Sequence, residues 1–101
     1  MKTNEFPSLS SNEFIIVEML IERGEMFGLE MIEHSHGKLK KGSIYVTLGR
    51  MEQKGLLASK EIARKNNEFG NNRRIYIPTE RGKRIFRAQE IAINFLNMGS
   101  F

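Results

Sequence analysis

The 101-residue sequence contains no cysteine, no tryptophan and only two prolines. Without cysteine, the chain can form neither a disulfide bond, nor a thiolate nucleophile, nor a cysteine zinc site. No apolar run approaches the roughly eighteen residues that a membrane-spanning helix needs, and residues 1–12 lack the apolar core of a signal peptide. We therefore expect a cytoplasmic protein without a membrane contact.

Motifs for catalysis are also missing. The glycines form neither of the common phosphate-binding loops, and the sequence supports no arrangement of a serine with a histidine and an acid as in a catalytic triad. His34 and His36 are separated by one residue, but with Glu33 as their only neighbouring carboxylate a surface loop explains them better than a metal site. We expect a protein that is not an enzyme and holds no metal or cofactor.

Charge is distributed unevenly along the chain, whose formal net charge is +4 at pH 7. Residues 1–33 hold seven acidic and two basic residues, whereas residues 34–87 hold fourteen basic and four acidic ones, a net charge of +10. A basic segment of this strength suits a polyphosphate partner. A lysine-rich face in contact with solvent would have the same composition, so charge alone does not decide between the two.

The first helix has a well-defined start and end. Ser10 and Glu13 have the spacing of a capping box, and Leu9 and Phe14 that of a hydrophobic staple. The helix then runs to Arg23, which a glycine follows. Apart from two glutamates its body is apolar, which is more than the single face that a surface helix buries. This excess predicts either a central helix or contact with a second subunit.

Two further helices follow. After a turn at residues 25–28, three apolar residues mark a short second helix, and residues 34–41 form a polar connection. The third helix is expected over residues 42–54, with a glycine in the position after it that favours glycine. Its buried face has the helical spacing i, i+4 and i+7 and consists of Ile44, Leu48 and Met51.

A hairpin and a last helix complete the chain. A weak strand signal at residues 58–64 is followed by turn-forming residues at 66–72 and by a returning strand at 73–77. Pro78 ends that strand, and Thr79 is a suitable N-cap for the last helix.

The order of these elements indicates a fold class. Three helices, a two-stranded hairpin and a C-terminal helix predict a mainly α fold with a small β-wing (α+β), the winged form of helix-turn-helix. In this fold the third helix can enter a major groove of DNA. We expect one domain over residues 1–101, with a winged-helix core at residues 8–78 and a dimerisation helix at residues 79–97.

The last helix, like the first, has more apolar surface than one small domain should need. We therefore expect both helices to form an interface between two copies of the chain. Phenylalanines there could line a cavity for a small aromatic effector, although dimer packing explains the same residues. The predicted interface residues are Phe14, Ile15, Ile85, Phe86, Ile93, Phe95 and Leu96.

Residues 42–57, GSIYVTLGRMEQKGLL, resemble the PadR family of transcriptional regulators. The family's signature here is a glycine, a small hydroxyl residue, an aliphatic residue and a tyrosine. A leucine, an arginine, an apolar–glutamate pair and a glycine–leucine exit follow. Residues 27–32 resemble the family's second-helix entry, and residues 73–76 and 79–82 resemble its wing strand and the start of its last helix.

The resemblance covers about residues 14–87 and has local departures. Val46 stands where the family usually has proline, Phe27 where it has histidine, and Pro78 where it has leucine. The short final helix resembles the compact branch of the family. The resemblance implies a homodimeric repressor, a type that in some members is released by phenolic or multidrug-like ligands.

The side of the third helix away from its buried face is expected to touch DNA. Thr47 can bond a base or touch a thymine methyl group, and Arg50 can reach a guanine or a phosphate. Tyr45 either reaches a phosphate or is half-buried between this helix and the wing. Lysines before the helix and basic wing residues would bind flanking phosphates. The predicted DNA-binding residues are Lys38, Lys40, Lys41, Ser43, Tyr45, Thr47, Arg50, Lys54, Lys65, Arg73 and Arg74.

These observations predict a sequence-specific DNA-binding transcriptional regulator, a repressor that acts as a homodimer on a pseudopalindromic operator. One alternative is a winged helix for protein–protein contact, which the basic third helix and wing argue against. Another is a ligand-responsive sensor with a cavity at the dimer interface. The expected partners are double-stranded DNA, a second copy of the chain and, for the sensor, a small aromatic effector.

Overall fold

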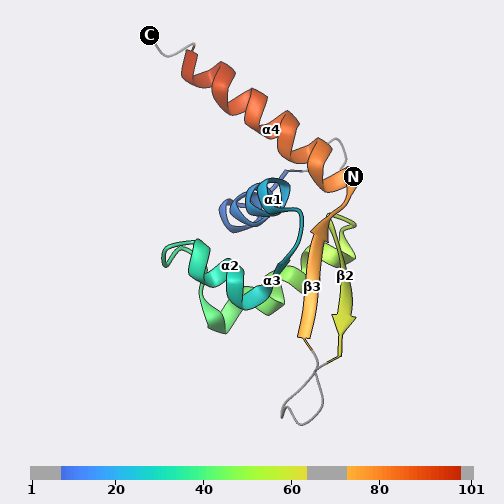
Figure 1. The fold of residues 1–101 in the computed structure, drawn as a ribbon. Helices are drawn as coiled ribbons and strands as arrows, with labels where there is room; N and C mark the ends of the chain where they lie inside the picture. The colour runs from blue at the N-terminus through green and yellow to red at the C-terminus, as the bar shows by residue number, and fades with distance from the viewer. Residues whose placement is uncertain (1–7, 64–72, 99–101) are drawn as a thin grey trace, which may run out of the picture.

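A computed structural model describes residues 8–63 and 73–98 of the chain (Figure 1). Its mixed architecture of helices with one small antiparallel sheet confirms the predicted winged-helix fold class. The elements are α1 Ser11–Arg23, β1 Met26–Phe27, α2 Gly28–His34, α3 Lys41–Gln53, β2 Leu57–Ile62, β3 Arg73–Pro78 and α4 Glu80–Met98.

The sheet has three strands in the order β1, β3, β2, one more than the sequence predicts. The predicted turn at residues 25–28 is wrong, because Met26 and Phe27 pair with Tyr76 and Ile75 of β3. A strand of two residues is too short to show the alternation that identifies a strand in sequence. Only its pairing with β3, far along the chain, defines it.

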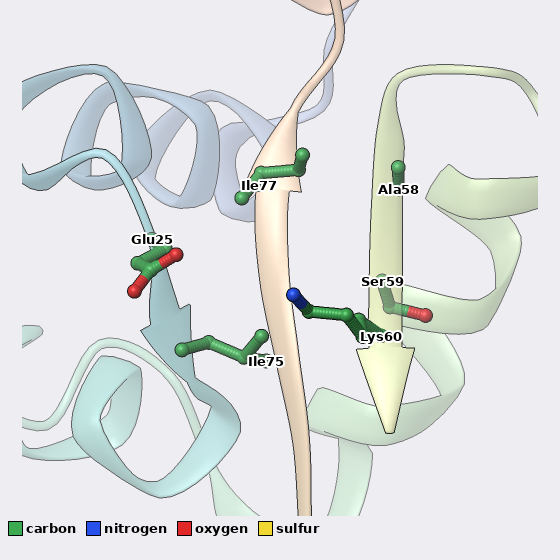
Figure 2. A pocket seen from close by; sticks show the side chains of 6 residues that line it. All are labelled: Glu25, Ala58, Ser59, Lys60, Ile75 and Ile77. Atoms are coloured by element: carbon green, nitrogen blue, oxygen red, sulfur yellow. The ribbon is translucent and has the colours of Figure 1, made fainter. Parts of the chain in front are cut away.

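The two faces of the sheet have different surroundings. Ser59 pairs with Tyr76 and Lys60 with Ile75, so alternate residues of β2 and β3 share a face. Tyr76 points into the core and is 4% exposed. Ile75 and Ile77 lie on the opposite face, and Lys60 extends toward β3 beside them (Figure 2). We call this second side the outer face of the sheet.

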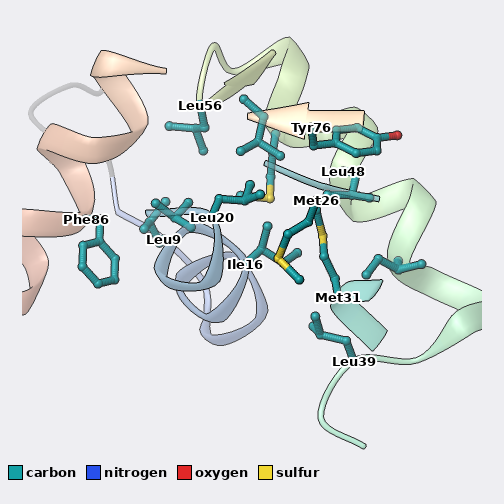
Figure 3. Packing of buried hydrophobic residues seen from close by; sticks show 14 residues of the cluster. Leu9, Ile16, Leu20, Met26, Met31, Leu39, Leu48, Leu56, Tyr76 and Phe86 are labelled. Atoms are coloured by element: carbon teal, nitrogen blue, oxygen red, sulfur yellow. The ribbon is translucent and has the colours of Figure 1, made fainter. Parts of the chain in front are cut away.

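The hydrophobic core lies between the sheet and the helices (Figure 3). From α1 it receives Ile16, Val17 and Leu20, each 0% exposed. From α3 it receives the residues predicted from helical spacing, at 2%, 0% and 0% exposure: Ile44, Leu48 and Met51. The predicted buried face of the third helix is therefore confirmed, and the other side of α3 is open to solvent.

Hydrogen bonds confirm both predicted N-caps. The Ser10 hydroxyl accepts from the Glu13 backbone N–H at 3.3 Å, and the Glu13 carboxylate accepts from the Ser10 N–H at 2.9 Å. Before α4, the Thr79 hydroxyl accepts from the Gly82 N–H at 3.0 Å. These bonds satisfy backbone donors that have no partner within their own helix.

Element boundaries differ from the predictions by a residue or two. α3 begins at Lys41 instead of residue 42, and Gly55, with φ of 80°, follows its C-cap as expected. β2 runs from Leu57 to Ile62, and β3 includes Pro78. The predicted hairpin tip at residues 66–72 lies outside the described residues, and so does Lys65.

The distal half of α4 extends away from the rest of the chain (Figure 1). Its first half is held in place, since the Phe86 and Phe14 ring centroids lie 4.5 Å apart. The Gln89 side-chain amide makes two hydrogen bonds, of 2.8 and 3.0 Å, with the backbone of Leu9. Residues 90–97 are all exposed. In the ranges that the structure covers, no helix is long and apolar enough to cross a membrane.

Candidate nucleic-acid interface

The solvent side of α3 brings together three of the predicted DNA-binding residues, Ser43, Thr47 and Arg50, with Val46 beside them. Ser43, Val46 and Arg50 are exposed and Thr47 is half-buried, and we call these four residues the recognition face. Val46 is 56% exposed although the other side of its helix is fully buried. Hydroxyl, methyl and guanidinium groups can all read base edges in a major groove. The recognition face therefore has the chemistry needed to bind duplex DNA.

The structure narrows the roles open to Thr47. Its hydroxyl donates to the carbonyl oxygen of Ser43 one turn earlier, at 3.2 Å. This bond, common for threonine inside helices, occupies the hydroxyl proton. The oxygen can still accept a hydrogen bond from a base amino group, and the methyl group can still touch a thymine.

Tyr45 connects α3 to α2 and is 49% exposed. Its ring lies against Gly28, the first residue of α2. A Cβ atom at Gly28 would lie 2.8 Å from the Cε1 atom of Tyr45 and 2.9 Å from its hydroxyl oxygen. Glycine is therefore what allows this close approach. One side of the Tyr45 ring therefore packs on α2, and the other side is open to solvent.

The lysines before α3 point outward because the turn between them is anchored in the core. Leu39 is 3% exposed, and its N–H donates to the buried Ser35 hydroxyl at 3.0 Å. Lys38 and Lys40 on either side of Leu39 are exposed, and so is Lys41 in the first turn of α3. The three lysines thus lie beside the recognition face.

The two wing arginines lie on opposite faces of the sheet, because neighbouring residues of a strand alternate. The Arg73 guanidinium lies 3.8 Å from the centroid of the Phe27 ring. Arg74 instead donates to the Ser59 hydroxyl at 3.0 Å, and that hydroxyl donates to the Glu52 carboxylate of α3 at 2.6 Å. Both arginines are among the predicted DNA-binding residues of the wing. Because neighbouring residues of a strand point to opposite faces of the sheet, the alternation in the sequence already indicates that Arg73 and Arg74 lie on different faces.

Lys54, at the C-cap of α3, is bound to α1. Its Nζ lies 2.9 Å from Oε2 of Glu13, whose side chain is 7% exposed. Burial raises the pKa of the Glu13 carboxyl, but hydrogen bonds from Lys54 and the Ser10 backbone, with the charge of Lys54, outweigh burial and hold the pKa below its ordinary value. The Lys54 ammonium thus joins α3 to α1, and we leave it out of the residues that we propose to contact DNA.

Glu13→Gln should destabilise the fold by about 1 kcal/mol at pH 7, because the variant loses the charge that binds the half-exposed Lys54. Since the Glu13 pKa is lower in the folded state, this stability is complete above the ordinary value of 4.5 and is lost as the pH falls through the folded-state pKa. Urea unfolding at pH 7 and at successively lower pH measures it. A difference between wild type and variant that stays constant with pH would contradict this role.

The predicted interface residues divide into two groups. Phe86 is 5% exposed, and Phe14, Ile15 and Ile85 are partly buried against the core. Phe86 packs between α4 and α1 of its own chain, which leaves little of its side chain for a second copy to cover. The other predicted interface residues lie open in the distal half of α4, at 42%, 72% and 70% exposure: Ile93, Phe95 and Leu96. Ile91, which is not among the predicted residues, lies in the same half of α4 and is 67% exposed.

A hollow of about 220 Å³ lies on the outer face of the sheet (Figure 2). Among the residues that the structure describes, no phenylalanine and no residue of α1 or α4 lines it. It is therefore different from the predicted alternative of a cavity between subunits that binds an aromatic effector. The lining residues are Glu25, Ala58, Ser59, Lys60, Ile75 and Ile77.

Similar proteins are found among families and solved structures. The model of the transcriptional regulator PadR-like family matches residues 16–88. A PadR family transcription regulator from hypervirulent Clostridium difficile is 26% identical with a TM-score of 0.72, over 88% of this chain and 93% of its own. One from Eggerthella lenta is 25% identical with a TM-score of 0.70, over 88% and 77%. A PadR-like transcriptional regulator from Bacillus cereus, 21% identical over 87% and 85%, shares the fold with a TM-score of 0.65. A search of the curated proteins finds no significant match.

The family match spans α2, α3, both long strands and the first half of α4. It therefore includes the recognition face, the lysines beside it and the wing arginines, and it agrees with the resemblance seen at residues 42–57. The chain belongs to the PadR-like family of transcriptional regulators.

Proposed function

We propose that the chain is a sequence-specific DNA-binding repressor that acts as a homodimer on a pseudopalindromic operator. The observation that supports it most is the recognition face of α3, because its polar and methyl groups are open to solvent while the other side of the helix is buried. Helices of this kind contact base edges chiefly with their N-terminal half. Ser43, Val46 and Thr47 lie in that half, and Arg50 follows one turn later.

Positive charge beside the recognition face supports binding to the DNA backbone. Lys38, Lys40 and Lys41 flank the start of α3 and are free to reach phosphates. On the wing, the stacked Arg73 is our candidate for a phosphate or the minor groove. Arg74 is bound to Ser59, so in our proposal it orients the wing relative to α3. The alternative function, a winged helix for protein–protein contact, does not explain why these basic residues gather around one helix.

The dimer in this proposal forms through the distal half of α4. Ile91, Phe95 and Leu96 are each at least 67% exposed, and such a group on one helix favours a partner that covers it. A second copy would supply the same residues, as in a two-fold symmetric interface. Phe14 and Phe86 contact each other within the chain, which weakens the case for a phenylalanine-lined effector cavity.

Arg50→Ala should weaken binding to the selected operator by about 1–3 kcal/mol, because a base-reading guanidinium is lost, and should weaken binding to random DNA less. The operator is first found by binding-site selection from a random pool, and affinities are then measured by fluorescence anisotropy. Arg84→Ala, which removes an exposed arginine from α4, is the matched control for charge.

Three outcomes decide the proposal. A larger loss on the operator than on random DNA supports it. Equal losses on both would show that Arg50 only positions the protein on the backbone. A wild-type chain that enriches no sequence from the pool would rule out the proposed function.

A further inference from the structure

The turn that ends α3 is held by the first turn of α4. Three successive carbonyl groups follow the helix, those of Lys54, Gly55 and Leu56, and each accepts a hydrogen bond from α4 or its N-cap. Arg81 Nε donates to the first at 3.1 Å, and the Thr79 hydroxyl donates to the second at 2.6 Å. The Thr79 backbone N–H donates to the third at 3.1 Å.

Close packing also joins the turn after α3 to the first turn of α4. The stem of Arg81 lies against Gly55, with Cδ 3.5 Å from where a Cβ of that glycine would be. Gly82 faces the carbonyl of Leu56 so closely that a Cβ would overlap its oxygen atom. Arginine is also a favourable partner for a helix C-terminus, because its charge offsets the negative end of the helix dipole.

The other attachment of this turn leads to α1. Lys54 contributes its carbonyl to Arg81 of α4 and its ammonium to Glu13 of α1. The C-terminal end of α3 is therefore fixed by these two helices, and α4 carries the apolar residues that we propose for the dimer.

We infer that Arg81 is a positioning residue that sets the angle between α3 and α4, and thereby the half-site spacing that a dimer accepts. The inference rests on the proposed function. α3 has 13 residues, so it is about 20 Å long. A tilt of about 10° at its held end moves the base-reading end by about 3 Å, close to the roughly 3.4 Å between base pairs.

The angle itself can be tested without DNA. Because the chain has no cysteine, Lys41→Cys and Asn94→Cys place one spin label on each helix. Labelled protein is diluted with unlabelled protein, and the distance within one chain is measured by pulsed electron paramagnetic resonance. Arg81→Ala should broaden or shift this distance by a few ångströms relative to Arg84→Ala. Identical distributions in the two backgrounds would overturn the inference.

Arg81→Lys is a second variant that keeps the test valid when Arg81→Ala does not fold. Circular dichroism shows whether each variant is folded. It keeps the positive charge and a stem against Gly55 but lacks the Nε–H donor, so it should broaden the distance as Arg81→Ala does. If Arg81→Lys folds and gives the wild-type distribution, the hydrogen bond does not set the angle and the inference fails.

The functional consequence is tested on duplexes whose half-sites are moved apart or together by one and two base pairs. Wild type and Arg84→Ala should prefer one spacing at least about tenfold, and Arg81→Lys should lower that preference to about threefold or less. Spacing profiles that coincide for Arg81→Lys and Arg84→Ala would overturn the inference. A wild-type chain that binds no duplex selectively would refute the proposed function, while the spin-label distances would still decide whether Arg81 positions α3.

Discussion

Phe95→Asp should convert the proposed dimer into monomers and weaken binding to a full operator by about 10²–10⁴-fold, the range by which joining two binding sites raises affinity. Phe95 is 72% exposed on the distal half of α4, so an aspartate there costs the fold of one chain little. In a dimer the same aspartate would place a charge in an apolar contact. Analytical ultracentrifugation measures the mass, and fluorescence anisotropy measures the affinity.

Asn94→Asp is the matched control, because it adds the same charge one residue earlier. Asn94 follows Arg87 and Glu90 at helical spacing, on the polar side of α4. This variant should remain a dimer with wild-type affinity. A Phe95→Asp variant that is still dimeric would place the interface elsewhere. A monomeric Phe95→Asp variant that binds as tightly as the control would show that operator binding needs one subunit only.

Gly82→Ala should destabilise the fold by about 3 kcal/mol or more, because its methyl group would overlap a backbone atom. The obstacle is the Leu56 carbonyl oxygen, which also accepts the Thr79 N–H at 3.1 Å. Relief of the overlap would therefore separate α4 from the turn after α3. Equilibrium unfolding in urea measures the loss.

Gly49→Ala is the control for adding a methyl group inside a helix. Among the described residues, no heavy atom beyond the neighbouring residues and backbone of α3 itself lies within 4 Å of the position that a Cβ would occupy there. Alanine should stabilise α3 at this position by about 0.5–1 kcal/mol, since it restricts the unfolded chain more than glycine does. If Gly82→Ala unfolds at the same urea concentration as wild type, the close approach to Leu56 does not constrain the fold.

The local parts of the structure could be predicted from sequence. The capping box of Ser10 and Glu13, the buried spacing of α3 and the Thr79 cap each depend on residues within one or two turns of a helix. Such signals follow from the geometry of the helix backbone, so they are the same in every fold that contains the helix. They were sufficient to identify the winged helix and the open side of α3.

The remaining features depend on contacts between distant segments. Lys54 and Glu13 are 41 residues apart, and no spacing rule connects them. Phe86 and Phe95 are both apolar residues of α4, yet one is 5% and the other 72% exposed. A helical pattern shows that a face is apolar, but it does not show whether its own chain or another one covers that face.

Arg81 illustrates the same limit. In sequence it is one of several basic residues along the last helix, for which contact with solvent is the ordinary interpretation. In the structure its Nε–H is bound to the carbonyl that ends α3. Its neighbours on α4 look equivalent in sequence, because the carbonyl that distinguishes Arg81 comes from a turn much earlier in the chain.

The stacking of Arg73 on Phe27 reduces the conformational entropy that the Arg73 side chain loses when DNA binds. A free arginine side chain samples many rotamers, and immobilising it opposes association by about 0.5–1.5 kcal/mol. The flat Phe27 ring already restricts that sampling before any duplex arrives. The edge of the guanidinium remains available for hydrogen bonds, because stacking occupies only its face. If Arg73 binds a phosphate as we propose, part of the rotamer entropy of its side chain is already lost when the protein folds, and binding to DNA loses only the rest.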